Sequence, residues 1–214
     1  MNEVVTGPAS LREDMKLDVL LLGCGNMHDK RINFSPEPEY QDVLGKGSPW
    51  DSFDKYAKLW LHDQVPELKE KFEDTIDGLF ILHDLNQLPY PWADEMFDEI
   101  HAYEVLEHCG RQGDGDFFFA QFNEFWRMLK PGGYFMLSVP MWDAEVAWGV
   151  PDHVRVLPPG IFGFLTKDYY DNIGKPGYGD YRHHLNGQYW IAVAKHETEE
   201  QLNVVLRKLP REDG

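Results

Sequence analysis

The chain has 214 residues with 43 % hydrophobic and 14 % aromatic content, which predicts one folded domain with a real core and excludes a chain that is disordered throughout. Its formal net charge is −17, from 37 acidic and 20 basic residues. That charge disfavours a dedicated nucleic-acid-binding protein, because phosphate backbones would be repelled at long range. No apolar stretch is long enough to span a bilayer, so no membrane association is expected.

The location of the protein is predicted from its N-terminus and its cysteines. Residues 1–16 have no basic segment followed by an apolar one, so no secretory signal is expected. Cys24 and Cys109 are too few for a disulfide framework or for a structural zinc site made by cysteines alone. We therefore expect a cytoplasmic protein in a reducing environment.

The first predicted element is a buried strand over residues 17–22, which is apolar nearly throughout. It runs directly into Gly23 and Gly25. Such a pair of glycines either closes a tight turn or lets a ligand touch bare backbone. Residues 26–50 are rich in Pro, Gly, Asn and Ser and are expected to be mostly irregular.

The next segment is predicted to be helical. The side chains that fall at helical spacing are Phe53, Tyr56, Leu59 and Trp60. Pro66 ends this helix, and a second short helix is expected through Leu68 and Phe72.

The rest of the chain alternates between apolar strands and helices. The strongest helix is residues 116–129, whose phenylalanines share one face. A short helix is expected near residues 158–165, and the charged tail is expected to be helical and then frayed. The predicted strands cover residues 78–85, 99–102, 134–140 and 188–196.

This alternation predicts an α/β fold, with a mostly parallel sheet and helices on both faces. Ligands of such sheets bind beyond the carboxyl ends of the strands. The segments that follow the predicted strands, and so form the candidate site, are Gly23–Asn26, His83–Asn86, Tyr103–His108 and Pro140–Trp142.

Four segments resemble, in order, the class I S-adenosylmethionine-dependent methyltransferases, and more narrowly the small ubiquinone/menaquinone-methylase-like proteins, including phage-type ones. The segments are VLLLGCGN, LHDLNQLPYPWADEMFDEIHAYEVLEH, FNEFWRMLKPGGYFMLSVP and WGVPDHVRVLPPGIFGFL. The resemblance implies a Rossmann-like, doubly wound sheet with a C-terminal antiparallel strand. It also implies one methyltransferase-like domain over residues 1–214, with an insertion or lid region around residues 27–77.

The resemblance implies S-adenosyl-L-methionine as the cofactor and transfer of its methyl group to an O, N or C nucleophile. The acidic total favours a small molecule, a glycan or a protein over nucleic acid as the acceptor. The implied cofactor-binding residues are Gly23, Cys24, Gly25, Asp84, Leu85 and Tyr103. Asp84 would pair with the adenine amino group, although an aspartate at such a position could instead cap its own turn.

No fixed catalytic residue is predicted, because the sulfonium already activates the methyl group and the protein must mainly align the two reactants. Candidate bases are His108, Tyr103 and His153. His108 could equally be a packing or capping residue. His153 and Arg155 could contact the acceptor, with Trp142 and Trp148 as walls.

The chain departs from the family pattern at three points. Leu21 stands where most relatives carry an acidic residue, and His28 stands where a third glycine is usual. The second strand, which ends in a ribose-binding acid in relatives, is not identified; Asp42 and Asp77 are the candidates for that acid. These departures favour an alternative hypothesis, a catalytically inactive S-adenosylmethionine-binding or protein-interaction module of the same fold.

Two further classes of enzyme are disfavoured by spacing. The GxGxxG fingerprint of dinucleotide oxidoreductases is not met. The histidines of HAYEVLEH are not at the HExxH spacing, and His183 and His184 are adjacent. No metal is therefore expected.

Overall fold

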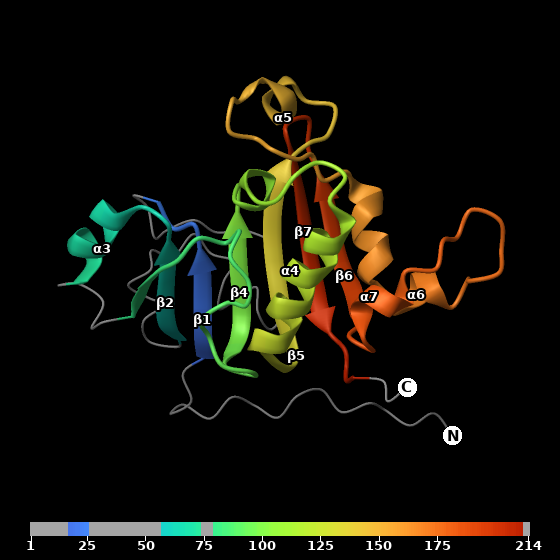
Figure 1. Ribbon diagram of the computed structural model, residues 1–214, viewed down its shortest axis with the longest axis horizontal. Coiled ribbons are helices and arrows are strands. Elements are labelled where there is room, and N and C mark those ends of the chain that lie inside the picture. The colour runs from blue at the N-terminus through green and yellow to red at the C-terminus, as the bar shows by residue number, and fades with distance from the viewer. Residues whose placement is uncertain (1–16, 26–56, 74–78, 212–214) are drawn as a thin grey trace.

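The computed structural model describes residues 17–25, 57–73 and 79–211 (Figure 1). These residues form a seven-stranded sheet in the order β3-β2-β1-β4-β5-β7-β6. The strands are β1 (Leu17–Leu22), β2 (Ala57–Asp63), β3 (Phe80–Leu82), β4 (Phe97–Tyr103), β5 (Leu129–Pro140), β6 (Trp190–Glu197) and β7 (Gln201–Lys208). Strands β1 to β5 are parallel, and β7 is antiparallel to both β5 and β6. This arrangement confirms the predicted Rossmann-like sheet with an antiparallel C-terminal strand.

The helical elements lie between the strands. They are α3 (Pro66–Glu73), η1 (Leu106–His108), α4 (Gly115–Met128), α5 (Glu145–Gly149), η2 (Pro159–Leu165), α6 (Lys167–Tyr170) and α7 (Arg182–Leu185). In Figure 1, α4 crosses in front of β5, and α5 stands beyond the carboxyl ends of the parallel strands.

Strand β1 is covered on both faces. Residues 19–22 are fully buried. Leu20 and Leu22 join a large hydrophobic cluster that includes the phenylalanines of α4, whereas Val19 and Leu21 join a second cluster with Leu68 of α3. Alternate residues of one strand therefore stabilise two layers, as expected of a central parallel strand. Leu21 is thus a core residue.

The prediction of a helix through Leu59 and Trp60 was wrong, because these residues lie in β2. Leu59 and Leu61 face the second cluster, and Trp60 packs against the first. The true period is two. Because both faces of this strand are buried, apolar residues occur at consecutive positions, and over a short stretch they fit the spacing of a helix as well as that of a strand. Phe53 and Tyr56 lie outside the described residues.

Residues 57–73 are therefore the second strand and its following helix. They are part of the sheet, so this portion of the region around residues 27–77 is not an insertion or lid. Helix α3 confirms the short helix expected after Pro66. The remaining parts of that region, 27–56 and 74–77, lie outside the described residues.

The expectation of a helical tail was also wrong. Residues 201–208 form β7, which pairs with β5 on one side and β6 on the other. Its central residues, Leu202 and Val204–Leu206, are buried. Tertiary pairing on both edges outweighs the local preference of a charged segment.

Helix α4 supplies the largest part of the core on its face of the sheet. Asp114 caps its N-terminus, since the Asp114 side chain accepts a hydrogen bond from the amide of Phe117 at 3.0 Å. The side chains that α4 buries are Phe118, Phe119, Gln121, Phe122, Phe125, Trp126 and Met128. No helix among the described residues is long and apolar enough to cross a membrane.

Replacement of Phe122 tests how much the buried face of α4 contributes to the stability of the fold. Phe122 is fully buried and its ring contacts the rings of Phe118, Phe135 and Phe162. We expect Phe122→Ala to lower the free energy of unfolding by about 3–5 kcal/mol in urea titrations, because a cavity remains in a packed core. The control Ile191→Ala, on exposed β6, should change it by less than about 1 kcal/mol. Similar losses in the two variants would contradict this view of the core.

Candidate functional site

A cavity of about 440 Å³ opens where four parallel strands end. The order of the sheet reverses between β1 and β4, because the chain passes from β1 to β2 on one side and later returns to β4 on the other. Such a switch point leaves a crevice beyond the carboxyl ends of the strands. The described residues that line the cavity are Gly23, His62, Asp63, Gln64, Leu85, Asn86, Glu104, Val105, His108, Cys109, Asp152 and Val154.

The end of β2 holds the glycine loop that follows β1. The amide of Gly23 donates to Nδ1 of His62 at 3.3 Å, and the amide of Cys24 donates to the carbonyl of His62 at 3.0 Å. The amide of Gly25 donates to Oδ2 of Asp63 at 2.9 Å. Three successive amides of the loop are therefore satisfied by two residues of one strand.

The two glycines have different reasons to be glycine. Both have positive φ, +57° at Gly23 and +54° at Gly25. A Cβ at Gly23 would lie 2.5 Å from Cγ2 of Val105, whereas a Cβ at Gly25 would meet nothing within 4 Å. Gly23 lines the cavity, and the side chain of Cys24 is buried in the second cluster. The loop thus presents bare backbone to the cavity at Gly23 and open space at Gly25.

Asp63 is the acid at the end of the second strand. Its other oxygen, Oδ1, accepts from the amides of Gln64 and Val65 at 2.8 and 3.1 Å. The side chain is therefore held firmly while it faces the cavity. The sequence candidates for an acid in this role, Asp42 and Asp77, lie outside the described residues.

The uncharged side chain of His62 links the loop after β1 to the loop after β3 by hydrogen bonds. Its Nε2 donates to the carbonyl of His83 at 2.9 Å, which leaves Nδ1 as the acceptor for the amide of Gly23. The acceptor role of Nδ1 requires the uncharged ring, and the contact at Nε2 places its single proton there. Burial lowers the pKa of His62 from 6.5 to about 4, which favours that same uncharged form.

Asp84 and Leu85 follow β3, as the sequence predicted, but they lie differently toward the cavity. Leu85 is buried and lines it, together with Asn86. The Asp84 carboxylate closes its own turn instead. Its Oδ1 accepts from the backbone and side-chain nitrogens of Asn86 at 2.9 and 3.0 Å. These hydrogen bonds hold the pKa of Asp84 below its usual range, with the backbone amide of Asn86 as the largest cause.

Tyr103 ends β4 in a buried row of polar side chains. Its hydroxyl donates to Nδ1 of His101, and Nε2 of His101 donates to the Glu99 carboxylate at 2.9 Å. Tyr103 belongs to the second hydrophobic cluster and is not among the described residues that line the cavity. The residue that faces the cavity from this strand end is the next one, Glu104.

Glu104 is held in a strained backbone conformation, with φ +55°. Its amide donates to the carbonyl of Ser138, and its Oε1 accepts from Oγ of Ser138 and Nε2 of Gln201, both at 2.8 Å. Residues of β5 and β7 thus fix a carboxylate at the end of β4. Such strain at a fixed side chain is typical of functional positions.

The two candidate histidines meet at the wall of the cavity. The ring centroids of His108 and His153 are 4.8 Å apart, and His108 lines the cavity. Arg155 is buried, with Nε donating to the carbonyl of Leu106 at 2.8 Å. Burial lowers its pKa. The predicted walls Trp142 and Trp148 are exposed and line neither described cavity.

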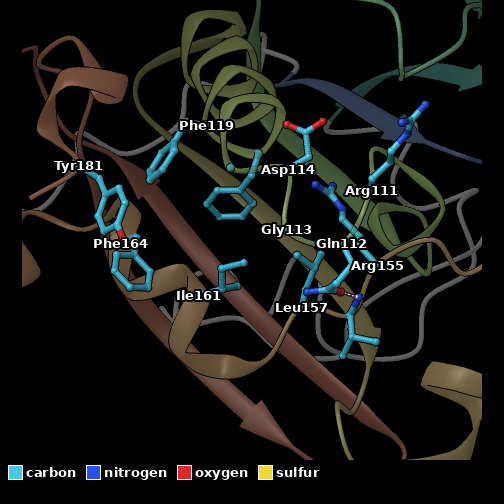
Figure 2. A pocket seen from close by; sticks show the side chains of 13 residues that line it. Arg111, Gln112, Gly113, Asp114, Phe119, Arg155, Leu157, Ile161, Phe164 and Tyr181 are labelled. Atoms are coloured by element: carbon cyan, nitrogen blue, oxygen red, sulfur yellow. Dashed lines mark hydrogen bonds between the residues drawn. The ribbon is translucent and has the colours of Figure 1, made fainter. Parts of the chain in front are cut away.

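A second cavity of about 200 Å³ is lined by residues 111–115, by α4, by residues 155–157 and by aromatic side chains of η2 and the loop before α7 (Figure 2). Figure 2 shows Phe119, Phe164 and Tyr181 on one side of it and Arg111 and Arg155 on the other. The Phe164 and Tyr181 rings are perpendicular with centroids 5.2 Å apart. Its wall is therefore aromatic, in contrast to the acidic wall of the first cavity.

Sequence reasoning missed the two cavity residues at the end of β2, His62 and Asp63. A signal for both was present, because Leu59 and Leu61 alternate with polar or aromatic neighbours before Asp63. The resemblance placed Glu104, with Tyr103, where the chain leaves the sheet, but its positive φ could not be recognised from side-chain type.

A family model described as "Methyltransferase domain" matches residues 44–137. Solved structures with the same fold include a putative methyltransferase from Bacillus halodurans, at 14 % identity over 94 % of this chain and 96 % of that chain, with a TM-score of 0.51. Another is the 1,6-didemethyltoxoflavin-N1-methyltransferase of Burkholderia thailandensis, at 14 % identity over 92 % and 72 %, with a TM-score of 0.51 and with S-adenosylhomocysteine bound. At such identities the likeness shows the fold alone. A comparison with curated proteins gave no match.

Because His62 must be uncharged to make its two hydrogen bonds, we expect the free energy of unfolding to depend on pH. The unfolded chain takes up a proton at this histidine near pH 6.5, but the folded chain does so only near pH 4. The stability from the neutral ring is therefore complete above pH 6.5 and declines as the pH falls toward 4, by roughly 3 kcal/mol.

The measurement is the free energy of unfolding between pH 7 and pH 4 for the wild type and for His62→Gln, which cannot titrate. We expect the wild type to lose roughly 3 kcal/mol more than the variant over this range. The control His196→Gln, at an exposed position on β6, should follow the wild type. Parallel curves for wild type and His62→Gln would show that His62 is not held neutral.

Proposed function

We propose that this chain, which resembles the class I S-adenosylmethionine-dependent methyltransferases in its fold and in its family-model match, binds S-adenosylmethionine in the larger cavity and transfers its methyl group to an O, N or C nucleophile. The observation that carries the proposal is the hydrogen bond from the Gly25 amide to the Asp63 carboxylate, which places this acid beside the glycine loop at the switch point of the sheet. A rigid acid beside bare backbone suits a ligand with sugar hydroxyls and a flexible tail.

The charge of the cavity supports this ligand over a phosphate-bearing one. The described residues that line it include the acids Asp63, Glu104 and Asp152 and no lysine or arginine. A dinucleotide would place phosphates near these carboxylates, whereas S-adenosylmethionine has a cationic sulfonium and an ammonium. The volume of about 440 Å³ falls in the range of small-molecule sites.

In the proposed pose, each part of the cofactor meets a different strand end. Asp63 would accept from the ribose hydroxyls, which is the role the family gives to the acid at the end of the second strand. Asp84 would accept from the adenine amine, with Leu85 as an apolar wall. Gly23 and Gly25 would border the methionyl part, beside Cys24. Glu104 would lie toward the methyl group, and Tyr103, which does not line the cavity, would act only by fixing the end of β4.

When bound, the cofactor supplies an electrophilic methyl group on sulfur. The chain's own part is to hold donor and acceptor in line and to exclude water. A base is needed only for an acceptor that must lose a proton, and His108 and His153 at the cavity wall are candidates for that role. We propose a small molecule, a glycan or a protein as the acceptor, since the net charge of −17 opposes nucleic acid.

One observation favours the alternative of a module that binds the cofactor without turnover. Leu21 is buried in β1, where most relatives carry an acid, so β1 offers no carboxylate to the methionyl amine. Incubation with methyl-labelled S-adenosylmethionine and a panel of small molecules, glycans and proteins separates the two hypotheses. Transfer of label above the level of heat-treated protein supports the enzyme, whereas cofactor binding with no transfer to any acceptor supports the module.

Removal of the two acids tests the cofactor pose. Calorimetry with S-adenosylhomocysteine should show affinity at least about 10-fold weaker in Asp63→Ala and in Asp84→Ala, equal to roughly 1.4 kcal/mol each. The exposed control Asp168→Asn on α6 should bind as the wild type does. Unchanged affinity in Asp84→Ala would leave Asp84 as a turn residue only, and unchanged affinity in Asp63→Ala would remove the ribose assignment.

The two glycines provide a matched pair of variants for the loop. Gly23→Ala must displace Val105, because its Cβ would lie 2.5 Å from Cγ2, whereas Gly25→Ala meets only the cost of a positive φ, about 1 kcal/mol. We expect Gly23→Ala to weaken S-adenosylhomocysteine binding at least about 10-fold more than Gly25→Ala does. Circular dichroism of both variants controls for folding. Equal losses of affinity in the two variants would show that the close approach of Gly23 to Val105 does not matter for binding.

A further inference from the structure

A cluster of three side chains at the wall of the larger cavity has the composition of a metal site. Glu107, His108 and His153 each place one ligand atom so that all three lie within 4.8 Å of one another. Glu107 and His108 come from η1, and His153 comes from the loop that follows α5. We propose that these three residues bind a divalent transition-metal cation, for which Zn²⁺ is the reference ion.

The backbone brings the two segments together without help from a cation. The amides of Val154 and Arg155 donate to the carbonyl of Glu107 at 2.9 and 3.3 Å. The two residues that follow His153 are therefore held against η1. A site whose ligands are already held close loses less conformational entropy when an ion binds.

The orientation of the His108 ring fits a metal ligand. Its Nδ1 lies 3.2 Å from the carbonyl of Asp152 and 3.3 Å from Oδ2 of the same residue. A proton on Nδ1 would satisfy both oxygens, and Nε2 would keep its lone pair. Nε2 is the atom that points toward Glu107, at 3.9 Å from Oε1. Histidines that bind metals usually donate their other ring nitrogen to a carboxylate or carbonyl in this way.

His153 supplies an independent observation. Its Nδ1 is buried and has no hydrogen-bond partner among the described residues. A buried polar nitrogen without a partner costs free energy, and a cation would relieve that cost. Glu107, which is 2 % exposed, would supply the negative charge that the ion needs.

The ligand set indicates the class of ion. Two imidazoles and one carboxylate suit Zn²⁺, Co²⁺ or Ni²⁺, whereas Mg²⁺ and Ca²⁺ prefer oxygen ligands. Two tetrahedral ligands at about 2.1 Å from one Zn²⁺ are roughly 3.4 Å apart, so ligand atoms that lie within 4.8 Å of one another would close by up to about 1.4 Å when the ion binds. Three protein ligands leave a further position open for water. In that metal-bound form His108 and His153 would be ligands and not the candidate bases named above.

The test uses the full chain after treatment with a chelator and its removal. Calorimetric titration with Zn²⁺ should give one ion per chain, and Co²⁺ should give visible absorption bands of a nitrogen-containing site. His153→Gln and His108→Gln should each weaken Zn²⁺ binding at least about 100-fold. His183→Gln is the matched control, because it alters the other histidine pair, whose rings lie 4.0 Å apart.

Each outcome decides the matter without any methyl transfer. Absence of stoichiometric Zn²⁺ binding by the wild type overturns the proposal. Loss of binding in His183→Gln rather than in His153→Gln also overturns it, since the ion would then sit at the exposed pair. Affinity for S-adenosylhomocysteine, measured on the same proteins, reports the cofactor site separately, so a failure of one proposal is distinct from a failure of the other.

Discussion

The hydrogen bonds between the end of β2 and the loop after β1 are the interaction on which the site depends. Neighbouring parallel strands end at the same edge of a sheet, so His62 and Asp63 lie beside the glycine loop as soon as β1 and β2 pair. Without these two residues the amides of Gly23 and Gly25 would have no partner of this kind, and the left-handed backbone there would be free to relax. The loop geometry is thus a product of pairing between strands, not of the loop sequence alone. The same pairing holds Asp63 rigid where it faces the cavity.

The two cavities differ in their walls: the larger one is acidic, whereas the smaller one is aromatic on one side and carries Arg111 and Arg155 on the other. In the larger cavity, Asp63 and Glu104 are each fixed by several hydrogen bonds, so the two carboxylates hold constant positions toward the cavity. A cationic ligand would be favoured there, and a divalent ion at Glu107, His108 and His153 would partly offset the same negative field. In the smaller cavity, Phe119, Phe164 and Tyr181 offer flat apolar faces. The segment 152–157 lines both cavities, with Asp152 and Val154 at the larger one and Arg155–Leu157 at the smaller one, so a shift of that segment would change both.

Sequence reasoning succeeded where one residue pattern had one structural meaning. The uninterrupted apolar run of residues 17–22 and the single apolar face of residues 116–129 predicted β1 and α4 to within a residue or so. It failed at β2, because both faces of this strand are apolar and the run Leu59, Trp60 and Leu61 therefore resembled a helix. Since the strand was not recognised, Asp63 at its end was not recognised as the candidate ribose-binding acid either. It failed at β7, because the polar residues at the ends of that strand hid a buried centre. The three proposed metal ligands could not be found by spacing, since His153 is brought to η1 only by backbone pairing between distant segments.

The position of β7 between β5 and β6 has a consequence for how the chain acquires its shape during translation. Until residues 201–208 leave the ribosome, β5 carries an open edge of unpaired amides and carbonyls, and β6 has no neighbour within the sheet. Such an edge is a template for pairing with another chain. A nascent protein stalled before this point would therefore be prone to aggregation and would need a chaperone, whereas insertion of the last strand seals both halves at once.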